Sequence, residues 1–271
     1  MGEIKDDDIK NILFKISKEI IIPKYQKLDF EDIKSKNNGD LVTSVDIDVE
    51  DRLKNDLLKL LPDSLFVGEE TFFQNPKIIE NYHKKNFCWT VDPIDGTTNF
   101  VKGKQKFAIM IALTFKEKII QSWIYKPLTE EFSYAKLGEG AFINGLKVIN
   151  IKEFNVSNSI GSISSKYWDE TYGKKINNIK KKFYNTNSYG CIGFEYVDIA
   201  KGIRNFTIMS KLSPWDHLPG ILIVKESGGF VKHFDESSYN LTIESKNLVV
   251  TNSINLLNEI LSLIREEIYE N

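Results

Sequence analysis

Two long apolar runs near the middle of the chain restrict its fold more than any other feature. Residues 107–115 and 119–125 are mainly aliphatic and aromatic, and the charged tripeptide Lys116-Glu117-Lys118 separates them. Apolar runs joined by so short a polar link are typical of two antiparallel strands. The chain therefore needs a β-sheet in which neighbours in sequence are neighbours in space, and we expect a hairpin turn at 116–118.

Helical patterns lie before this hairpin, and strands alternate with helices after it. An apolar stripe at helical spacing follows the acidic residues 6–8, and a second amphipathic helix is predicted over 45–61, where Pro62 ends it. Further strands are predicted at 65–67, 87–91, 134–135, 141–143, 160–164, 205–209, 230–233 and 248–251. Further helices are predicted at 166–181, 195–201, 214–227 and 254–269. Antiparallel strands followed by alternating elements predict a layered fold of the α/β or α+β class.

Length and composition are those of one globular domain. The chain has 271 residues, of which 41% are hydrophobic and 27% charged, values normal for a protein with a sizeable core. No repeat, low-complexity tract or linker-like stretch interrupts the sequence. We therefore predict a single domain over 1–271 that consists of two closely packed lobes, approximately 1–150 and 151–271.

Charge and run length argue against nucleic-acid and membrane partners. The chain has 36 Lys+Arg and 38 Asp+Glu, so the basic excess of a typical nucleic-acid binder is missing. Its longest apolar run, 107–115, is about half of the roughly 20 residues that a membrane-spanning helix needs. The first eight residues are acidic, unlike a signal peptide, and two cysteines are too few for a disulfide framework. We expect a soluble, cytoplasmic protein.

The most informative segment is Asp-Pro-Ile-Asp-Gly-Thr-Thr-Asn-Phe at 92–100. Asp92 follows an apolar strand, and we expect Pro93 to stop that strand from pairing further. In a tight turn, the carboxylates of Asp92 and Asp95 and the Ile94 carbonyl would face one point, as Mg²⁺ ligands do. Residues 96–98, Gly-Thr-Thr, follow at once, and backbone amides at a helix start attract phosphate. Carboxylates beside an anion cradle are typical of metal-assisted phosphoryl hydrolysis, because cations must bridge the two.

The same string is also a common turn sequence, because Asp, Pro and Gly are frequent turn formers. Two further acidic signals favour the metal hypothesis. Glu69-Glu70 directly follows a predicted strand, and Trp215-Asp216 begins a predicted helix. Each signal is weak by itself, since an acidic residue near a helix start often interacts only with the helix dipole.

Together these segments resemble the signatures of the inositol monophosphatase family. The matching segments, in the family's order and spacing, are 40–46, Glu69-Glu70, 92–100, Trp215-Asp216 and 226–229. The resemblance extends over residues 40–250 and implies an αβαβα sandwich. It also implies a Mg²⁺-dependent, lithium-sensitive phosphomonoesterase that acts on a small-molecule phosphate ester, commonly as a homodimer.

The resemblance further implies a set of ligands for each of two Mg²⁺ ions and a weaker site for a third. Glu69, Asp92 and the Ile94 carbonyl would bind the first, activating ion. Asp92, Asp95 and Asp216 would bind the second, and Glu69 would assist a weaker third. Such a pair of ions would activate a water and stabilise the charge on the departing alkoxide.

The remaining roles implied by the resemblance concern the water and the phosphate. Thr97 would orient the attacking water with its hydroxyl linked to Asp46, so Thr97, Asp46 and Glu69 are the predicted catalytic residues. The amides of Gly96 and Thr97 would bind the phosphate. The predicted phosphate- and substrate-binding residues are Asp95, Gly96, Thr97, Thr98, Glu195 and Asp216.

The residues expected to contact the substrate's leaving group differ from the family pattern. Inositol-specific members carry a glutamate shortly before the Trp-Asp motif, whereas this chain has Met209, whose thioether cannot hold a polyol by hydrogen bonds. Glu195 lies where many members have small residues. Two interpretations of Glu195 stay open: a carboxylate that contacts the leaving group, or an ordinary exposed helix residue.

We therefore expect hydrolysis of a small alcohol phosphate, with inositol 1-phosphate as the first choice. Histidinol phosphate, a sugar phosphate or bisphosphate, and a nucleotide 3′-phosphate are the alternatives. Few basic residues flank 92–100, which argues against a multiply phosphorylated nucleotide. A non-catalytic regulatory protein that keeps the metal and phosphate pocket is a different class of function, and the intact carboxylates and Thr97 argue against it. Cys88 and Cys191 are expected to be inert core thiols.

Overall fold

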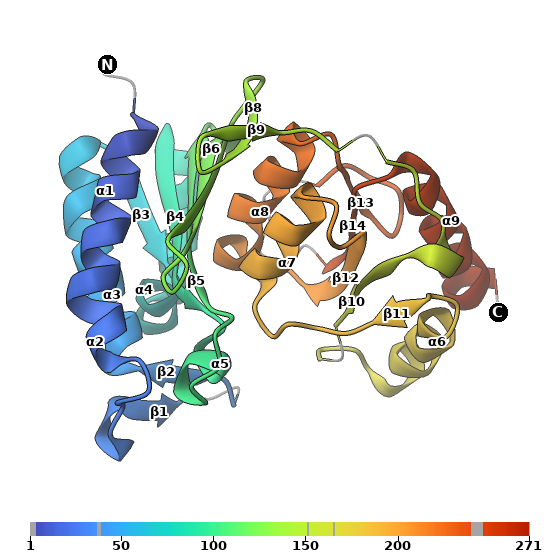
Figure 1. The fold of residues 1–271 in the computed structure, drawn as a ribbon, viewed down its shortest axis with the longest axis horizontal. Helices are drawn as coiled ribbons and strands as arrows, with labels where there is room; N and C mark the ends of the chain where they lie inside the picture. Colours follow the sequence, from blue (N-terminus) through green and yellow to red (C-terminus); the bar gives the residue numbers. More distant parts are fainter. Residues whose placement is uncertain (1–3, 37–38, 151, 165, 240–245, 271) are drawn as a thin grey trace.

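The chain folds into five alternating layers of helix and sheet. A computed structural model describes residues 4–36, 39–150, 152–164, 166–239 and 246–270. Helices α1 and α3 form one outer layer, and α6 and α9 form the other (Figure 1). Between them lie two β-sheets that enclose α7 and α8. This order of layers confirms the expected αβαβα sandwich.

The first sheet has seven strands within the described residues, in the order β3-β4-β5-β6-β7-β8-β9. The strands are β3 (Leu65–Gly68), β4 (Phe87–Asp95), β5 (Ala108–Phe115), β6 (Lys118–Lys126), β7 (Glu131–Lys136), β8 (Gly140–Ile143) and β9 (Leu146–Val148). The predicted hairpin is confirmed, because β5 pairs antiparallel with β6. Lys116 and Glu117 have φ angles of 46° and 66°, the left-handed backbone that a two-residue hairpin turn requires.

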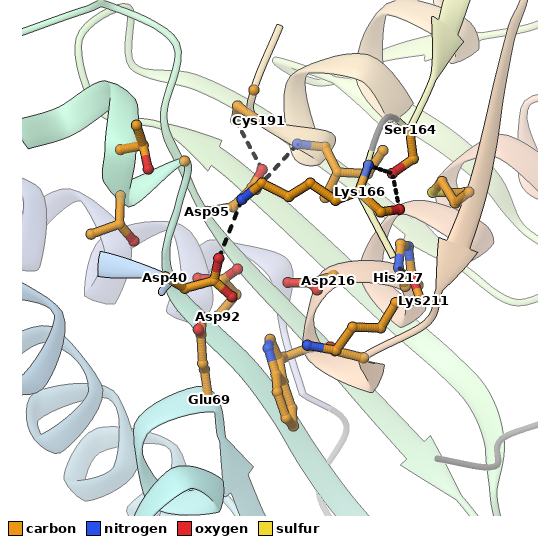
Figure 2. Close-up of a pocket in the computed structure, with 18 of the residues that line it drawn as sticks. Asp40, Glu69, Asp92, Asp95, Ser164, Lys166, Cys191, Lys211, Asp216 and His217 are labelled. Carbon is orange, nitrogen blue, oxygen red and sulfur yellow. Dashed lines mark hydrogen bonds and ion pairs between the residues drawn. The ribbon is translucent and has the colours of Figure 1, made fainter. Parts of the chain in front are cut away.

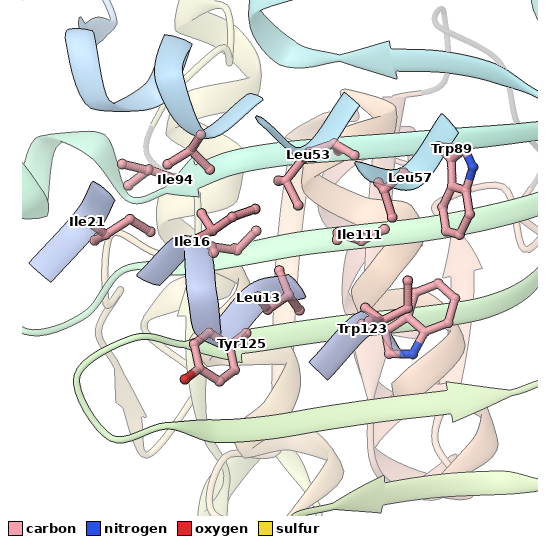
Figure 3. Packing of buried hydrophobic residues seen from close by; sticks show 14 of the residues in the cluster. Leu13, Ile16, Ile21, Leu53, Leu57, Trp89, Ile94, Ile111, Trp123 and Tyr125 are labelled. Carbon is pink, nitrogen blue, oxygen red and sulfur yellow. The ribbon is translucent and has the colours of Figure 1, made fainter. Parts of the chain in front are cut away.

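Two long helices cover the outer face of this sheet. They are α1 (Asp6–Ile16), which continues through η1 (Ser17–Ile21) and α2 (Ile22–Lys24), and α3 (Ser44–Leu60). Figure 3 shows Leu13 of α1 and Leu53 and Leu57 of α3 in one cluster with Trp89 and Trp123 of the sheet. These side chains are at most 1% exposed, so the predicted apolar stripes of both helices form the core of the first lobe.

The second sheet has five strands within the described residues, in the order β11-β10-β12-β14-β13. The strands are β10 (Ile160–Ile163), β11 (Asn185–Thr186), β12 (Phe206–Lys211), β13 (Phe230–His233) and β14 (Lys246–Thr251). Its outer face packs on α6 (Glu170–Lys180) and α9 (Ile254–Ile264), which continues as η5 (Arg265–Glu270). Its inner face packs on α7 (Ile192–Ala200) and α8 (Pro214–Glu226). Both inner helices therefore contact both sheets.

Several predicted boundaries were wrong, and local hydrogen bonds explain them. Strand β4 does not end at Asp92 but continues to Asp95 through a β-bulge. Helix α6 begins at Glu170 rather than at residue 166, because the Asp169 carboxylate accepts the Tyr172 amide and caps the helix there. The short elements that were not predicted include the strands β9 and β11 and also η2 (Phe30–Asp32), β1 (Ile33–Ser35), β2 (Leu41–Thr43), α4 (Glu69–Gln74), η3 (Pro76–Lys84), α5 (Thr97–Val101) and η4 (Val156–Asn158).

Among the described helices, none is both long and apolar enough to cross a membrane.

Candidate functional site

A cavity of about 460 Å³ opens between the two sheets, and all the predicted site residues except Asp46 line it. Figure 2 shows Glu69, Asp92, Asp95 and Asp216 converging from three different elements. Glu69 begins α4, Asp92 and Asp95 lie at the end of β4, and Asp216 lies in the first turn of α8. The fold therefore brings together segments that are far apart in the sequence.

The bulge in β4 directs two carboxylates into this cavity. Asp92 pairs with Met110 and Asp95 with Ala108, so β4 has one more residue than β5 between these pairs. In a regular strand, side chains three residues apart point to opposite faces of the sheet. The extra residue restores a common direction, which is a known use of bulges. Pro93 lies within this bulge, and the strand continues past it rather than ending there.

Three carboxylates form a cluster that fits a divalent cation. Glu69, Asp92 and Asp216 each offer an oxygen, and these oxygens all lie within 4.8 Å of one another. Asp92 is only 2% exposed, and its Oδ1 has no hydrogen-bond partner among the described residues. A buried carboxylate oxygen without a donor is costly unless a cation binds it. Because all the donors are hard oxygens, the set suits Mg²⁺.

Burial and the closeness of the carboxylates also raise the pKa values of these groups. Burial raises the pKa of Asp92 well above its ordinary value, and the nearby Glu69, Asp95 and Asp216 raise it further. Burial, followed by the charges of Glu69 and Asp95, raises the pKa of Asp216 to about 8. Without a cation, the cluster therefore holds protons to neutralise its own charge.

Asp95 is fixed by α7 rather than by the three clustered carboxylates. Its Oδ1 accepts the Ile192 amide at 3.1 Å, and its Oδ2 accepts the Gly193 amide at 2.6 Å and the Cys191 thiol at 2.8 Å. Burial raises the pKa of Asp95 to about 6, although these hydrogen bonds oppose the rise. Cys191 was expected to be a plain core thiol; it is buried, and it also contacts a site carboxylate.

Thr97 lines the cavity, and Asp46 contacts it from α3. The Thr97 hydroxyl lies 3.1 Å from Asp46 Oδ1 and 3.0 Å from the Ile94 carbonyl oxygen. Asp46 is held by a capping box at the start of α3, where its Oδ2 accepts the Thr43 amide at 2.8 Å. Burial raises the pKa of Asp46 to about 6. The sequence predicted a helix start near residue 45, but it gave no sign of the capping box or of the contact between Asp46 and Thr97.

Gly96 forms the bend between β4 and α5. Its φ of 90° is left-handed, and a Cβ here would lie 2.9 Å from the Lys106 carbonyl oxygen. The Gly96 carbonyl accepts the amides of Asn99 and Phe100. The amides of Thr97 and Thr98 therefore belong to the first turn of α5, where the helix itself offers no acceptor.

Comparison with known proteins agrees with this geometry. The sequence profile of the Inositol monophosphatase family matches residues 7–269. The chain belongs to the inositol monophosphatase family. Its members are phosphatases that hydrolyse phosphoric monoesters and are generally metal-dependent, and this chain is such an enzyme.

Three relatives within the family show how far the similarity extends. A "Fructose-1,6-bisphosphatase/inositol-1-monophosphatase" of Thermotoga maritima is 29% identical over 231 residues, which are 85% of each chain. "Inositol monophosphatase 1" of Solanum lycopersicum is 32% identical over 80% of each chain. The solved structure of a Thermotoga maritima IMPase superimposes with a TM-score of 0.83 at 26% identity and covers 97% of this chain and 98% of its own.

Lys36 is a site residue that the sequence analysis missed. Its Nζ lies 2.7 Å from both Glu69 Oε1 and Glu70 Oε1, and its side chain is 6% exposed. The β1–β2 hairpin places it there, since the pairing of Ile33 with Thr43 folds this segment back toward α3. A single lysine in a short polar segment carries no signal from which this ion pair could be predicted.

The structure contradicts one of the two interpretations of Glu195, and the leaving-group contact stays a prediction. The exposed-helix interpretation is wrong, because Glu195 is 2% exposed. Its Oε1 accepts the Tyr189 amide at 2.8 Å and the Ser188 hydroxyl at 3.0 Å, and its Oε2 accepts the Ser162 hydroxyl. Glu195 lines the cavity while it fixes the 188–190 segment that forms part of the cavity wall.

Two further residues of the cavity lining, Met209 and His217, are uncharged. Met209 lines the cavity and is 6% exposed. His217 contacts the Tyr196 hydroxyl through Nδ1 at 2.9 Å and the Lys211 carbonyl oxygen through Nε2 at 3.1 Å. Burial lowers the pKa of His217 to about 4, so the ring is neutral and links α8 to its neighbours.

Proposed function

We propose that this enzyme is a Mg²⁺-dependent phosphomonoesterase for a small alcohol phosphate. The observation that carries the proposal is the cluster of Glu69, Asp92 and Asp216 around an unpartnered, buried Asp92 oxygen. Glu69, Asp92 and the Ile94 carbonyl would hold one Mg²⁺, and Asp92, Asp95 and Asp216 a second. Bound Mg²⁺ would supply an activated water and offset the charge on the leaving oxygen.

The protein's own groups position the two reactants. The Thr97 hydroxyl, held between Asp46 and the Ile94 carbonyl, would orient the attacking water. The amides of Gly96, Thr97 and Thr98 would bind phosphate oxygens at the start of α5. Since β4 and α5 are both packed into the core, these groups are pre-oriented for attack.

Inositol 1-phosphate is the first substrate to test. The tomato relative is named as an inositol monophosphatase, and the Thermotoga maritima relative is named for both inositol 1-phosphate and fructose 1,6-bisphosphate hydrolysis. Met209 offers no hydrogen-bond donor to a polyol, so histidinol phosphate, sugar phosphates and a nucleotide 3′-phosphate belong in the same panel.

The decisive experiment measures phosphate release from this panel with Mg²⁺, with EDTA, and with an Asp92→Asn variant. We expect turnover that requires Mg²⁺ and falls at least about 10³-fold in Asp92→Asn, since the variant loses a carboxylate ligand of both ions. Asp48→Asn is the matched control, because Asp48 is exposed on the same helix as Asp46. Wild-type turnover in Asp92→Asn would show that the metal assignment is wrong.

Absence of turnover on this panel would leave two interpretations: a leaving group outside the panel, or a regulatory protein that binds metal and phosphate without turnover. Calorimetry with Mg²⁺ and inorganic phosphate then distinguishes a site that binds both without turnover from a site that binds neither. The same assay with added Li⁺ tests the expected inhibition.

We further propose that the protein is a cytoplasmic homodimer. Light scattering after size exclusion tests the dimer, and fractionation of the source cells tests the compartment.

A further inference from the structure

A second cavity adjoins the catalytic cavity at the segment 188–190. Its volume is about 590 Å³, a size at which protein cavities commonly hold small molecules. Ser188 lines both cavities, so the two share this segment as a wall. The second cavity is lined by Lys104, Lys106 and Lys126, and no acidic residue is among its described lining residues. We call it the lysine pocket.

Two aromatic rings hold cations together at the lysine pocket. The ring centroid of Phe194 lies 5.5 Å from Lys106 Nζ and 4.2 Å from Lys126 Nζ. The ring centroid of Tyr189 lies 3.2 Å from Lys106 Nζ and 4.2 Å from Cζ of Arg204. Each ring thus lies close to two positive charges, which its electron-rich face attracts. Lys106 is common to both pairs and forms the centre of the cluster.

Few carboxylates compensate these cations. Lys126 Nζ lies 2.7 Å from a Glu131 oxygen, which belongs to a carboxylate that a second lysine shares, and 3.8 Å from Asp198. Within the part of the chain that the structure describes, Lys106 contacts the two rings and forms no ion pair. Lys104 is exposed, and it also has no ion pair among the described residues. The lysine pocket therefore has more positive charge than its neighbouring carboxylates neutralise.

The buried charge of Arg204 adds to this excess. Arg204 is 1% exposed, and its Nε has no hydrogen-bond partner among the described residues. Burial lowers the pKa of Lys106, and the charges of Lys126 and Arg204 lower it further, although the charge of Asp198 opposes the change. Like charges therefore crowd Lys106, and a bound anion would relieve their repulsion.

The chemistry of the lysine pocket selects an anion with more than one charge. Lysines provide N–H donors and positive charge but no acceptor. Their strongest hydrogen bonds are those to carboxylate and phosphate oxygens. A ligand with a single charge would compensate only one of the two lysines that lack an ion pair in the described structure. Leu128 and the two rings offer apolar contact to a short carbon chain between the charged groups.

We propose that the lysine pocket binds a small organic polyanion whose carboxylate or phosphate groups pair with Lys104, Lys106 and Lys126. None of the proposed Mg²⁺ ligands is among its described lining residues. Binding therefore requires no metal and is independent of the proposed phosphatase function. The Tyr189 amide donates to Glu195 and the Tyr189 carbonyl accepts the Asn99 side chain, so the polyanion would contact a segment that also forms the wall of the catalytic cavity.

Calorimetric titration of the full chain tests the proposal. The probe is tricarballylate, which is propane-1,2,3-tricarboxylate, and the uncharged comparison is glycerol, which has the same three-carbon chain. Divalent cations are removed beforehand with a chelating resin, because EDTA is itself a polyanion and would compete for the pocket. Without Mg²⁺, the carboxylates of the catalytic cavity repel the probe, so saturable heat reports on the lysine pocket.

Four variants locate the bound probe. Lys106→Gln removes one charge, and the double variant Lys104→Gln/Lys106→Gln removes two. Neither lysine is fully buried, so we expect both variants to fold, which circular dichroism checks. Lys106→Arg keeps the charge beside the rings. Lys102→Gln is the matched control, because Lys102 is exposed in the same segment and is not among the described lining residues of the pocket.

We expect the wild-type protein to bind one tricarballylate per chain and to give no saturable heat with glycerol. The Kd of tricarballylate should rise at least about tenfold in Lys106→Gln, which is the effect of losing one charge-assisted hydrogen bond. The Kd should rise further in the double variant. It should stay near the wild-type value in Lys106→Arg and in Lys102→Gln.

Three results would overturn the inference. One is the absence of saturable tricarballylate binding in the wild-type protein. Another is an equal Kd in the wild-type protein and in the double variant. The third is a Kd that falls in Asp92→Asn, which would place the anion in the catalytic cavity, where that carboxylate lies. Failure of the proposed function would look different: the protein would release no phosphate with Mg²⁺, while the metal-free titration would still show binding.

Discussion

At the scale of single residues, protons and Mg²⁺ compete for the same carboxylates. Burial raises the pKa of Asp216 to about 8 and those of Asp95 and Asp46 to about 6, from an ordinary value of 3.8. Between pH 3.8 and about pH 8, the metal-free folded state thus binds more protons than the unfolded chain does. Its stability therefore falls as the pH rises through this interval.

Mg²⁺ should reverse this loss, because it binds the deprotonated carboxylates. We expect the Mg²⁺-induced rise in melting temperature to be larger at pH 8 than at pH 6. Thermal unfolding with Mg²⁺ and with EDTA at each pH measures it, and Asp92→Asn should show almost no rise. An equal rise at both pH values would contradict the raised pKa values.

Glu195 offers a second test at this scale. Its buried carboxylate accepts three hydrogen bonds, and the glutamine amide can replace only part of them. We expect Glu195→Gln to lower the free energy of unfolding by about 1–3 kcal/mol, the usual loss for a hydrogen bond to a charged group. Urea unfolding measures this change. Glu170→Gln, at a side chain that is 85% exposed, should change it little.

At the scale of elements, the contact between α7 and α8 sets the relation between two parts of the site. Helix α7 holds Asp95 through the amides of Ile192 and Gly193, and α8 carries Asp216. The helices approach closely at Gly220, where a Cβ would lie 2.0 Å from the ring of Tyr196. A change at this contact therefore moves Asp216 relative to Asp95.

We expect Gly220→Ala to destabilise the protein by about 1–3 kcal/mol through overpacking and to raise the Mg²⁺ concentration needed for half-maximal activity. Gly173→Ala on α6 is the matched control. Its Cβ would meet Trp168 at 3.9 Å, an ordinary contact, so alanine should be neutral or slightly stabilising there. Similar effects of the two substitutions would mean that the α7–α8 contact does not position the site.

At the scale of the whole molecule, the two sheets share one central layer. Side chains of α7 and α8 pack with Ala108 and Met110 of the first sheet and with Leu248 and Val250 of the second. Either lobe alone would expose this apolar layer to water. The site itself needs both lobes, because Asp92 and Asp216 lie on opposite sides of the division near residue 150.

We therefore expect the lobes to unfold together, as the proposed single domain requires. Unfolding in urea should give coincident curves by far-UV circular dichroism and by tryptophan fluorescence. Trp89 and Trp123 report on the first lobe, Trp168 on the second, and Trp215 on the contact of the second lobe with Phe72 of the first. Mg²⁺ should shift both curves by the same amount. Two separate transitions would show that the lobes fold independently.

The sequence by itself determined the strand hairpin, the amphipathic helices and the identity of the acidic residues. Each depends on local chemistry: the period of apolar side chains, turn residues, and the family's short motifs. The tertiary structure alone decided the β4 bulge that aims Asp92 and Asp95 together, the burial of Glu195, and the approach of Lys36, Lys166 and Lys211 to the site. These features depend on strand register and on contacts between distant segments, which no short stretch of sequence encodes. The few basic residues around 92–100 were thus a poor guide to the charge of the cavity, because its lysines come from other elements.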